Sequence, residues 1–274
     1  MSTASIREIN QSLRMLDARV FQILSLFFLL CAGLSSWNFV IEWKQAVLCF
    51  ASALFTQAMF QVIEFHRFPD GKKPFNWMSP WITSSSLLLL LKSTTIWVHP
   101  FAAFVAISSK FFFRIKGKHF FNPANFAIVI SLMLLPAWIS PGQWGRTPLL
   151  IFFALSAGAA VTSRARTTRV SAYFLTFFSL MLLCRVLYLE YELSIWTHQI
   201  SNGVILIFAF FMISDPKTSP YSTFGIILHT LLVSILSMYF IFFKYEPNAL
   251  MYSLFMLSPV VALFHYFKPN IKHA

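Results

Sequence analysis

The sequence is poor in charged residues and in cysteine. Asp, Glu, Lys and Arg make up 11% of its 274 residues, whereas a soluble domain carries roughly 25%. The three cysteines, Cys31, Cys49 and Cys184, stand apart in apolar stretches, with no C-x-x-C pair and no Cys/His cluster. The sequence therefore gives no support to a zinc site, an iron–sulfur cluster or a disulfide framework. It also lacks a serine, cysteine or carboxylate constellation typical of hydrolases.

Apolar residues dominate instead. They form 58% of the chain, phenylalanine alone contributes 33 residues, and the mean hydropathy is +0.70. A water-facing surface does not accommodate this composition, so we expect an integral membrane protein. We interpret residues 1–274 as one membrane domain, with a cytoplasmic N-terminal segment (1–19) and a cytoplasmic tail (268–274). The first apolar run lacks a good cleavage site, so we expect it to be a retained span and no signal peptide.

Apolar runs between polar breaks predict about ten transmembrane helices, several of them shorter than the roughly 20 residues of a full span. The predicted fold is therefore all-α and polytopic. The expected spans lie near residues 20–37, 45–65, 78–92, 94–109, 123–138, 148–163, 170–189, 199–214, 221–243 and 249–267.

The distribution of basic residues predicts the orientation. With ten spans and an internal N-terminus, the outer segments hold only Lys44, Lys92, Arg146, Arg185 and Lys244, and the other 16 of the 21 Lys and Arg lie inside. This asymmetry follows the positive-inside rule and places both termini in the cytoplasm. The net charge of +12 thus reflects topology, and we expect no nucleic acid as a partner. Ten spans divide into five and five, which predicts an inverted repeat with short or broken helices.

Two polar stretches mark helix starts on the predicted cytoplasmic side. In "KHFFNPANF", Asn122 precedes Pro123 and an apolar run, and in "SDPKTSPYSTFG", Ser219 precedes Pro220 and another. Asn and Ser are favoured N-caps, and Pro suits the first helical position. We therefore predict helices beginning at both places.

The residues around these two starts suggest a binding site. Helix N-termini attract anions and polarised carbonyls, and several cations surround the first start. Converging starts would form an electropositive pocket for a flat ring with carbonyl groups, such as a flavin or a quinone. The competing interpretation is a basic cytoplasmic loop explained by orientation alone. The aromatic side chains that we expect at the pocket edge are Phe111, Phe112, Phe113, Phe120 and Phe121.

Both stretches resemble signatures of the NqrB/RnfD family. The segment "GKHFFNPANF" is similar to its G-K-H-x-F-N-P-[AS]-x-[FL] region, and "FMISDPKTSP" is similar to its F-M-x-[TS]-D-P-x-[TS]-[SA]-P signature. The resemblance covers roughly residues 60 to 235 and is nearest to compact, UnbU-like members. It implies a ten-helix subunit of an RnfABCDGE-type electron transport complex, an electron carrier more than a stand-alone catalyst, with possible ion coupling. It also implies membrane lipid and other complex subunits as partners, in a bacterial cytoplasmic (inner) membrane.

The matching motif positions imply a site for a non-covalent flavin (riboflavin or FMN) or a quinone, and no metal site. These positions are Lys118, His119, Asn122, Pro123, Asn125, Ser214, Asp215, Thr218 and Ser219.

The chain departs from the family in one motif. The family's well-known members attach FMN to a threonine in S/T-G-A-T, and this motif is absent from the sequence. The corresponding stretch, 191–208, contains Thr197 without G-A-T, so we expect no covalent FMN. Two other functions stay open on this ground: a small-solute transporter or channel of the same fold, and a membrane scaffold without cofactor. His99 and His229 lie within or beside spans, where a functional histidine and a structural one are equally expected.

Overall fold

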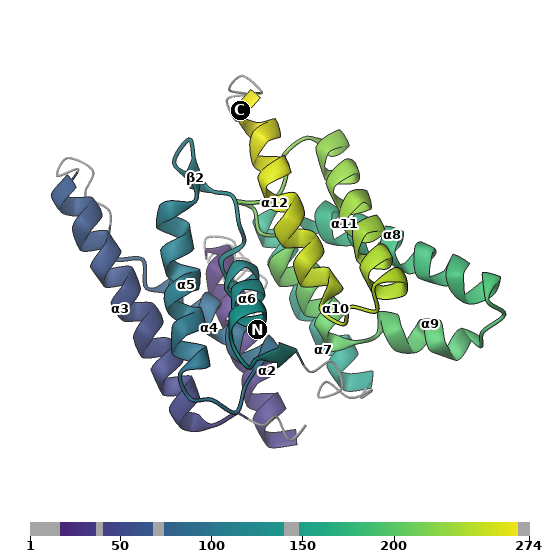
Figure 1. The fold of residues 1–274 in the computed structure, drawn as a ribbon, viewed down its shortest axis with the longest axis horizontal. Coiled ribbons are helices and arrows are strands. Elements are labelled where there is room, and N and C mark those ends of the chain that lie inside the picture. The colour runs from purple at the N-terminus through teal and green to yellow at the C-terminus, as the bar shows by residue number, and fades with distance from the viewer. Residues whose placement is uncertain (1–16, 37–40, 68–73, 140–147, 268–274) are drawn as a thin grey trace, which may run out of the picture.

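The computed structural model describes residues 17–36, 41–67, 74–139 and 148–267, and these form a bundle of helices with two very short strand pairs (Figure 1). The helices are α2 (Ala18–Ser36), α3 (Trp43–Arg67), α4 (Met78–Leu90), α5 (Val98–Phe112), α6 (Pro123–Leu134), α7 (Pro148–Ala165), α8 (Thr168–Tyr188), α9 (Leu193–Ile200), α10 (Gly203–Ile207), the π-helix η2 (Phe208–Met212), α11 (Thr223–Phe243) and α12 (Ala249–Phe267). The strands are β1 (Leu91–Lys92), β2 (Arg114–Ile115), β3 (Lys118–His119) and β4 (Trp138–Ile139).

Each of the ten predicted spans contains a helix. By length and composition, α3, α8 and α11 are long and apolar enough to cross a membrane, and α9 with α10 and η2 makes a fourth if this bent pair is one span. Shorter apolar helices include α5, α6 and parts of α2 and α12. The prediction of a polytopic all-α membrane protein is confirmed.

The two halves of the chain repeat one packing pattern. In the first half α3 packs on α5 and α5 on α6, and in the second half α8 packs on α11 and α11 on α12. The halves meet through α2 against α7 and through α6 against α12, which are the first and the last helix of each half. The start of α2 and the end of α7 line the same cavity, so these two helices run in opposite directions. This is the arrangement that an inverted repeat requires.

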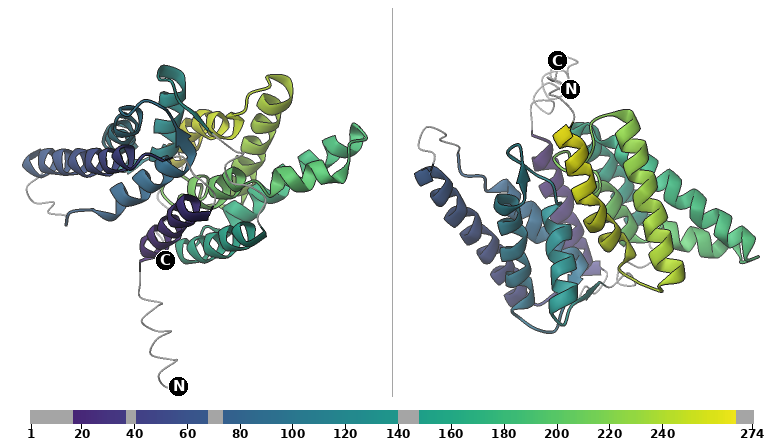
Figure 2. Two further views of the ribbon diagram at one scale, coloured as in Figure 1. Left: turned by 90° about the horizontal axis from the view of Figure 1, so that it is seen from below. Right: turned by 45° about the horizontal axis from the view of Figure 1, so that its top comes forward.

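One end of the bundle, named here the basic end, carries the start of α2, the β2–β3 hairpin, the end of α7 and residues 213–222. The end of α12 lies at this end too (Figure 2, right). The opposite end carries β1 and β4 and is named the β1–β4 end.

Helices α4 and α6 are among those too short to cross a bilayer. Helices α4 and α6 have 13 and 12 residues, about 18–20 Å at 1.5 Å per residue, against a hydrocarbon core of about 30 Å. Helix α4 continues directly as β1, α6 is followed by β4 after residues 135–137, and β1 pairs antiparallel with β4. This pairing satisfies backbone groups that a helix break would otherwise leave unpaired inside the membrane.

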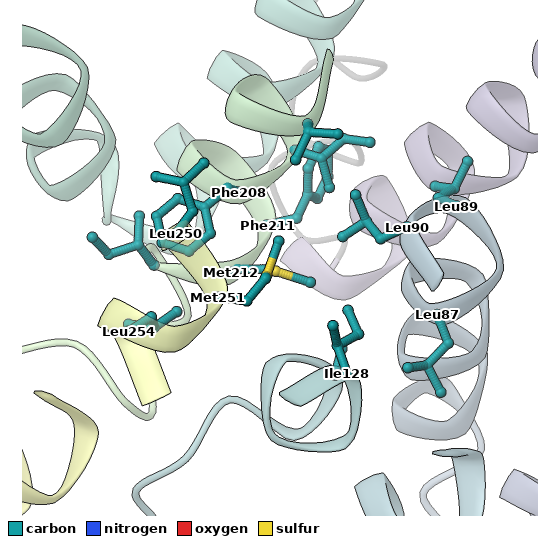
Figure 3. Packing of buried hydrophobic residues seen from close by; sticks show 14 of the residues in the cluster. Leu87, Leu89, Leu90, Ile128, Phe208, Phe211, Met212, Leu250, Met251 and Leu254 are labelled. Carbon is teal, nitrogen blue, oxygen red and sulfur yellow. The ribbon is translucent and has the colours of Figure 1, made fainter. Parts of the chain in front are cut away.

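The apolar core lies in the middle of the bundle, where the short helices meet the second half of the chain (Figure 3). Leu87 and Leu90 of α4 and Ile128 of α6 face Phe211 and Met212 of η2. Leu250, Met251 and Leu254 of α12 complete this layer.

One predicted helix start is wrong. Helix α11 begins at Thr223, and its N-cap is Ser222, whose Oγ accepts a hydrogen bond from the Gly225 N–H at 3.1 Å. Ser219 lies before the helix and donates its hydroxyl to the Ile213 carbonyl at 2.7 Å. Ser-Pro mimics a cap signature, but here the 213–222 turn uses Ser219 internally, and the following Ser222 caps the helix.

A cavity with polar walls at the basic end

The start of α6 is capped as the sequence predicts. Asn122 has an extended backbone, its Oδ1 accepts from the Asn125 N–H at 3.1 Å, and Pro123 takes the first helical position. The Asn122 amide also donates to the Met212 carbonyl at 3.3 Å. The N-cap of α6 therefore joins the end of η2, so the two motif stretches, 118–126 and 208–220, meet in space.

The β2–β3 hairpin sets the position of His119. Lys116 and Gly117 both have positive φ angles, 52° and 78°, as a two-residue type I′ turn requires. The turn pairs Arg114 with His119. His119 is thereby directed toward residues 213–222, where its Nε2 lies 3.9 Å from Oδ2 of Asp215.

Asp215 sits in a tight turn that holds its carboxylate at the cavity. Its backbone carbonyl accepts from the Thr218 and Ser219 N–H groups, and its Oδ1 accepts from the Lys217 N–H at 2.9 Å. Burial alone would raise the pKa of Asp215, but His119 and Lys217 outweigh burial and lower the pKa below its ordinary value of 3.8. The side chain is 18% exposed. It is therefore a mostly buried, charged carboxylate.

A cavity of about 140 Å³ opens between these elements. Its walls come from α2, α4, α5, α6, α7, η2 and the 213–217 segment. Along α4 it follows Ser79, Thr83 and Ser86, whose spacing of four and three residues defines one helix face. It therefore penetrates about 10 Å along that helix, at 1.5 Å per residue, and Leu87, next to Ser86, belongs to the apolar layer of Figure 3.

Lys110 is the most buried cation of the cavity wall. It lies on α5 with 6% of its surface exposed, and its ammonium donates to Ser79 Oγ at 2.7 Å. Ser79 is the second residue of α4, and Trp77, at the N-cap, makes no side-chain cap hydrogen bond. A buried ammonium thus meets a helix N-terminus without a side-chain cap on the wall of one cavity.

The structure brings only part of the predicted residue set to the cavity. Its walls include five of the nine predicted residues, namely His119, Asn122, Pro123, Ser214 and Asp215. The described cavity lining does not include the other four predicted residues, which are Lys118, Asn125, Thr218 and Ser219.

The four other residues hold the surrounding structure. Lys118 is exposed and donates to the Tyr221 hydroxyl at 2.9 Å. Asn125 is 1% exposed, and its amide donates to the Met251 carbonyl of α12 at 3.2 Å. Thr218 and Ser219 bond within their own turn. These residues can shape the site, but they do not face it.

The predicted aromatic edge is wrong. None of the five phenylalanines expected there belongs to the described cavity lining. Phe111 stacks on Phe60, and Phe113, Phe120 and Phe121 contact one another. They therefore pack in two groups, one against Phe60 and the other among themselves.

The aromatic wall comes from η2 instead, through Phe210 and Phe211. A Cβ added at Gly158 of α7 would lie 2.3 Å from the Phe210 ring, so the glycine leaves room for this ring. A π-helical turn inside an α-helix frequently marks a functional site.

The nine predicted site residues do not include Arg19, Ser79, Thr83 and Lys110, which other helices contribute, or Lys217 of the 213–222 segment. The sequence placed Lys110 and Lys217 beside the two predicted helix starts, and for Lys110 a further signal existed. Lys110 interrupts an apolar helix, and an ionisable residue within a span is a functional hypothesis by default. For Arg19 and Ser79, only the packing of α2 on α4 and of α4 on α5 shows that they reach the cavity.

The profile of a family described as "NQR2, RnfD, RnfE family" matches residues 149–272. The second half of the chain is therefore similar to this family. The match includes η2, Asp215 and α11, whereas the "KHFFNPANF" stretch lies before it, so the contact between the two stretches is a finding of the structure. No curated protein matches the chain.

Proposed function

We propose that this RnfD/NqrB-type membrane subunit binds a flavin non-covalently in the cavity at the basic end and relays electrons within a membrane complex. The single observation that carries this proposal is the pairing of opposite polar groups on one cavity wall. Lys110 offers N–H donors, and Asp215 offers a charged acceptor.

This pairing favours a flavin over a quinone. The polar edge of a flavin ring presents two carbonyl oxygens with an N–H between them, and so needs both donors and an acceptor. A quinone presents only acceptors, which a buried carboxylate would repel. Asp215 therefore has a donor to accept from in a flavin, but none in an oxidised quinone.

The residues that line the cavity fit the polar edge of a flavin ring, but the cavity does not enclose the whole ring. An ammonium carries three N–H donors, and for Lys110 the described residues provide one hydrogen bond, to Ser79. Phe210 and Phe211 provide apolar ring surfaces. The cavity volume of 140 Å³ is below the roughly 300–1,000 Å³ of pockets that enclose drug-sized ligands, so the polar edge would enter while the rest extends toward the mouth.

A bound flavin would supply the electron-accepting chemistry, and the protein would supply position and charge. Asp215 and Lys110 would orient the polar edge, and the apolar layer beyond Ser86 would keep water from the far side. His119, 10% exposed at its side chain, would hold the Asp215 carboxylate in its ionised form.

The test is the spectrum of the purified full chain after gentle extraction, with flavin added and excess removed. We expect stoichiometric flavin absorbance that is released by denaturation. Absence of flavin after reconstitution would overturn the proposal and favour a scaffold without cofactor.

A second function has one observation in its favour. The small cavity, open at the basic end and bounded by an apolar layer, would also suit a small-solute transporter or channel in one closed state. Uptake of a small polar solute by vesicles containing the protein, with no flavin bound, would support this alternative.

We also propose that the basic end faces the cytoplasm of a bacterial inner membrane, with both termini on that side. A reporter fused after Ala274 should then report cytoplasm, and one inserted near Gly142 should report the outside. Gly142 lies outside the described residues. A C-terminal reporter detected outside would overturn the orientation.

A further inference from the structure

We infer that the corner where α8 and α11 begin binds the headgroup of an anionic phospholipid. The residues that carry this inference, Arg166, Arg169, Thr223 and Phe224, do not belong to the described cavity lining. The inference is therefore independent of the proposed flavin. It depends on two arginines without an acidic partner, which lie beside an exposed aromatic ring at the start of two long helices.

Helices α8 and α11 pack against each other, and both begin at the basic end (Figure 1). Each has 21 residues and is long and apolar enough to cross a membrane. Arg169 is the second residue of α8, and its Nη1 lies 3.5 Å from Oγ1 of Thr223, the first residue of α11. Because membrane-crossing helices begin at the bilayer surface, this contact places Arg169 at the level of lipid headgroups.

The two arginines have no acidic partner among the described residues. Arg166 and Arg169 are both exposed, and neither forms an ion pair with a described residue. The acidic residues described at the basic end are paired with other basic groups, namely Asp17 with Arg19, Glu64 with Arg114 and Asp215 with His119. The other described acidic residues lie at the opposite, β1–β4 end, and they are Glu42, Glu190, Glu192 and Glu246. The described part of the chain therefore supplies no anion for these two guanidinium groups.

The chemistry of the corner suits a phosphate. Arginine binds phosphate well because its planar fork donates two parallel N–H bonds to one phosphate group. Arg169 has five N–H donors, and its one contact described here, to Thr223, is neutral and long. The start of α8 adds to the attraction, because Thr167 at its N-cap makes no side-chain cap hydrogen bond and the helix dipole favours an anion there.

The apolar surface next to the arginines favours a lipid over an acidic protein. Phe224, the second residue of α11, is 75% exposed, and Ile235 and Tyr239 are exposed further along the same helix. Their spacing of 11 and 4 residues places all three on one helix face. The acyl chains of a phospholipid would cover this face while its phosphate meets the arginines. A soluble acidic protein would approach the arginines from the water and leave the membrane-crossing face uncovered.

Native mass spectrometry of the detergent-purified full chain tests the inference, with phosphatidylglycerol and phosphatidylcholine of identical acyl chains as probes. A basic residue near an anionic lipid surface contributes about fivefold to binding. We therefore expect the first phosphatidylglycerol to bind about 25-fold more tightly than the first phosphatidylcholine. Phosphatidylglycerol should also raise the unfolding temperature by more than phosphatidylcholine does.

Variants locate the site. Arg166→Gln and Arg169→Gln should each lower the preference for phosphatidylglycerol about fivefold, and the double variant should remove it. Arg169→Lys should keep most of the preference because it keeps the charge. The matched control is Arg67→Gln, which removes an exposed arginine at the same end. Arg67 ends α3, on the other side of the bundle from α8 and α11 (Figure 1), so its loss should leave the preference unchanged.

Three outcomes would overturn the inference. Equal affinity for the two lipids would show that the corner does not select an anionic headgroup. An equal loss of preference in Arg67→Gln and Arg169→Gln would show that basic residues act only as a diffuse charge at this end. Displacement of phosphatidylglycerol by inorganic phosphate or by polyglutamate, at the same concentration as the lipid, would assign the arginines to a free anion or to an acidic protein.

Discussion

Two buried lysines lie near opposite ends of α4 and have different partners. Lys92 and Lys110 are each 6% exposed. Lys92, beyond the C-terminus of α4, donates to the Leu88 carbonyl of that helix at 3.0 Å. Lys110, at the N-terminus of α4, donates to the Ser79 hydroxyl beside a cavity.

The difference follows from the charge at each helix end. A helix C-terminus has unpaired carbonyls and a partial negative charge, which a cation satisfies. The Leu91 carbonyl is likewise in hydrogen-bonding distance of His99 Nε2, at 3.1 Å. A helix N-terminus repels a cation, so Lys110 depends on other partners, namely the Ser79 hydroxyl and the Asp215 carboxylate on the same cavity wall. Lys92 thus stabilises the helix break, whereas Lys110 lies on the wall of the cavity that we propose as a ligand site.

The largest expected effect concerns the carboxylate that faces Lys110. Asp215→Asn retains an acceptor for the Lys217 N–H but removes the negative charge opposite the ligand. Loss of a charge-assisted hydrogen bond of about 1.5–3 kcal/mol should weaken flavin binding about 10- to 100-fold, as measured by fluorescence titration.

The matched control is Glu64→Gln, which removes one negative charge at the same end. Glu64 pairs with Arg114 and does not belong to the described cavity lining. Full flavin affinity in Asp215→Asn, with normal elution in size-exclusion chromatography, would mean that the 213–222 segment is only a turn.

Part of this site was predictable from sequence because its signals are local. The N-cap Asn122 with Pro123 at the first helical position is a backbone requirement, and the structure shows it. Ser219–Pro220 carries the same local signal, yet the turn uses Ser219 for the Ile213 carbonyl. Local patterns therefore give the segments and some caps, but they do not decide between competing hydrogen-bond partners.

The rest depends on contacts between distant segments. Charge counting placed Lys92 in an outer segment, which suggests a solvated side chain, but the structure buries it against α4. Phe210 replaces the predicted phenylalanines because Gly158 of α7 accommodates its ring. The apolar residues of a membrane protein provide weak periodicity, so their sequence does not reveal which faces meet.

A stability comparison of the two lysines should separate their roles. Lys92→Met leaves the Leu88 carbonyl without this donor and should lower the free energy of unfolding by about 1–3 kcal/mol. Lys110→Met should leave the ligand-free protein as stable or more stable, because it replaces a buried ammonium with an apolar side chain.

Thermal unfolding of the ligand-free variants in detergent measures this comparison, and adding FMN extends it. FMN should raise the unfolding temperature of Lys92→Met and have little effect on Lys110→Met. Equal destabilisation of both ligand-free variants would show that Lys110 is a structural lysine like Lys92.

A smaller effect is expected at the aromatic wall. Gly158→Ala places a methyl group against the Phe210 ring, and such overpacking typically costs about 1–3 kcal/mol if the ring cannot move. Because the Phe210 ring borders the cavity, we expect it to shift toward the cavity. Part of the cost should then lower the stability, and part should lower the flavin affinity. Ala160→Ser, an exposed change on the same helix, should alter neither in the same two assays.

The last prediction concerns the Thr197 hydroxyl on α9, where we expect no covalent flavin and so no change in the mass of the protein. Thr197 lies on α9, is exposed, and donates to the Ser194 carbonyl at 2.9 Å, but it lacks the S/T-G-A-T context of covalent flavin attachment. Intact-mass measurement after coexpression with a flavin transferase should therefore show no added FMN, with a known S/T-G-A-T protein as the positive control. An increment that maps to Thr197 would move the flavin site away from the cavity and remove the need for a ligand beside Lys110.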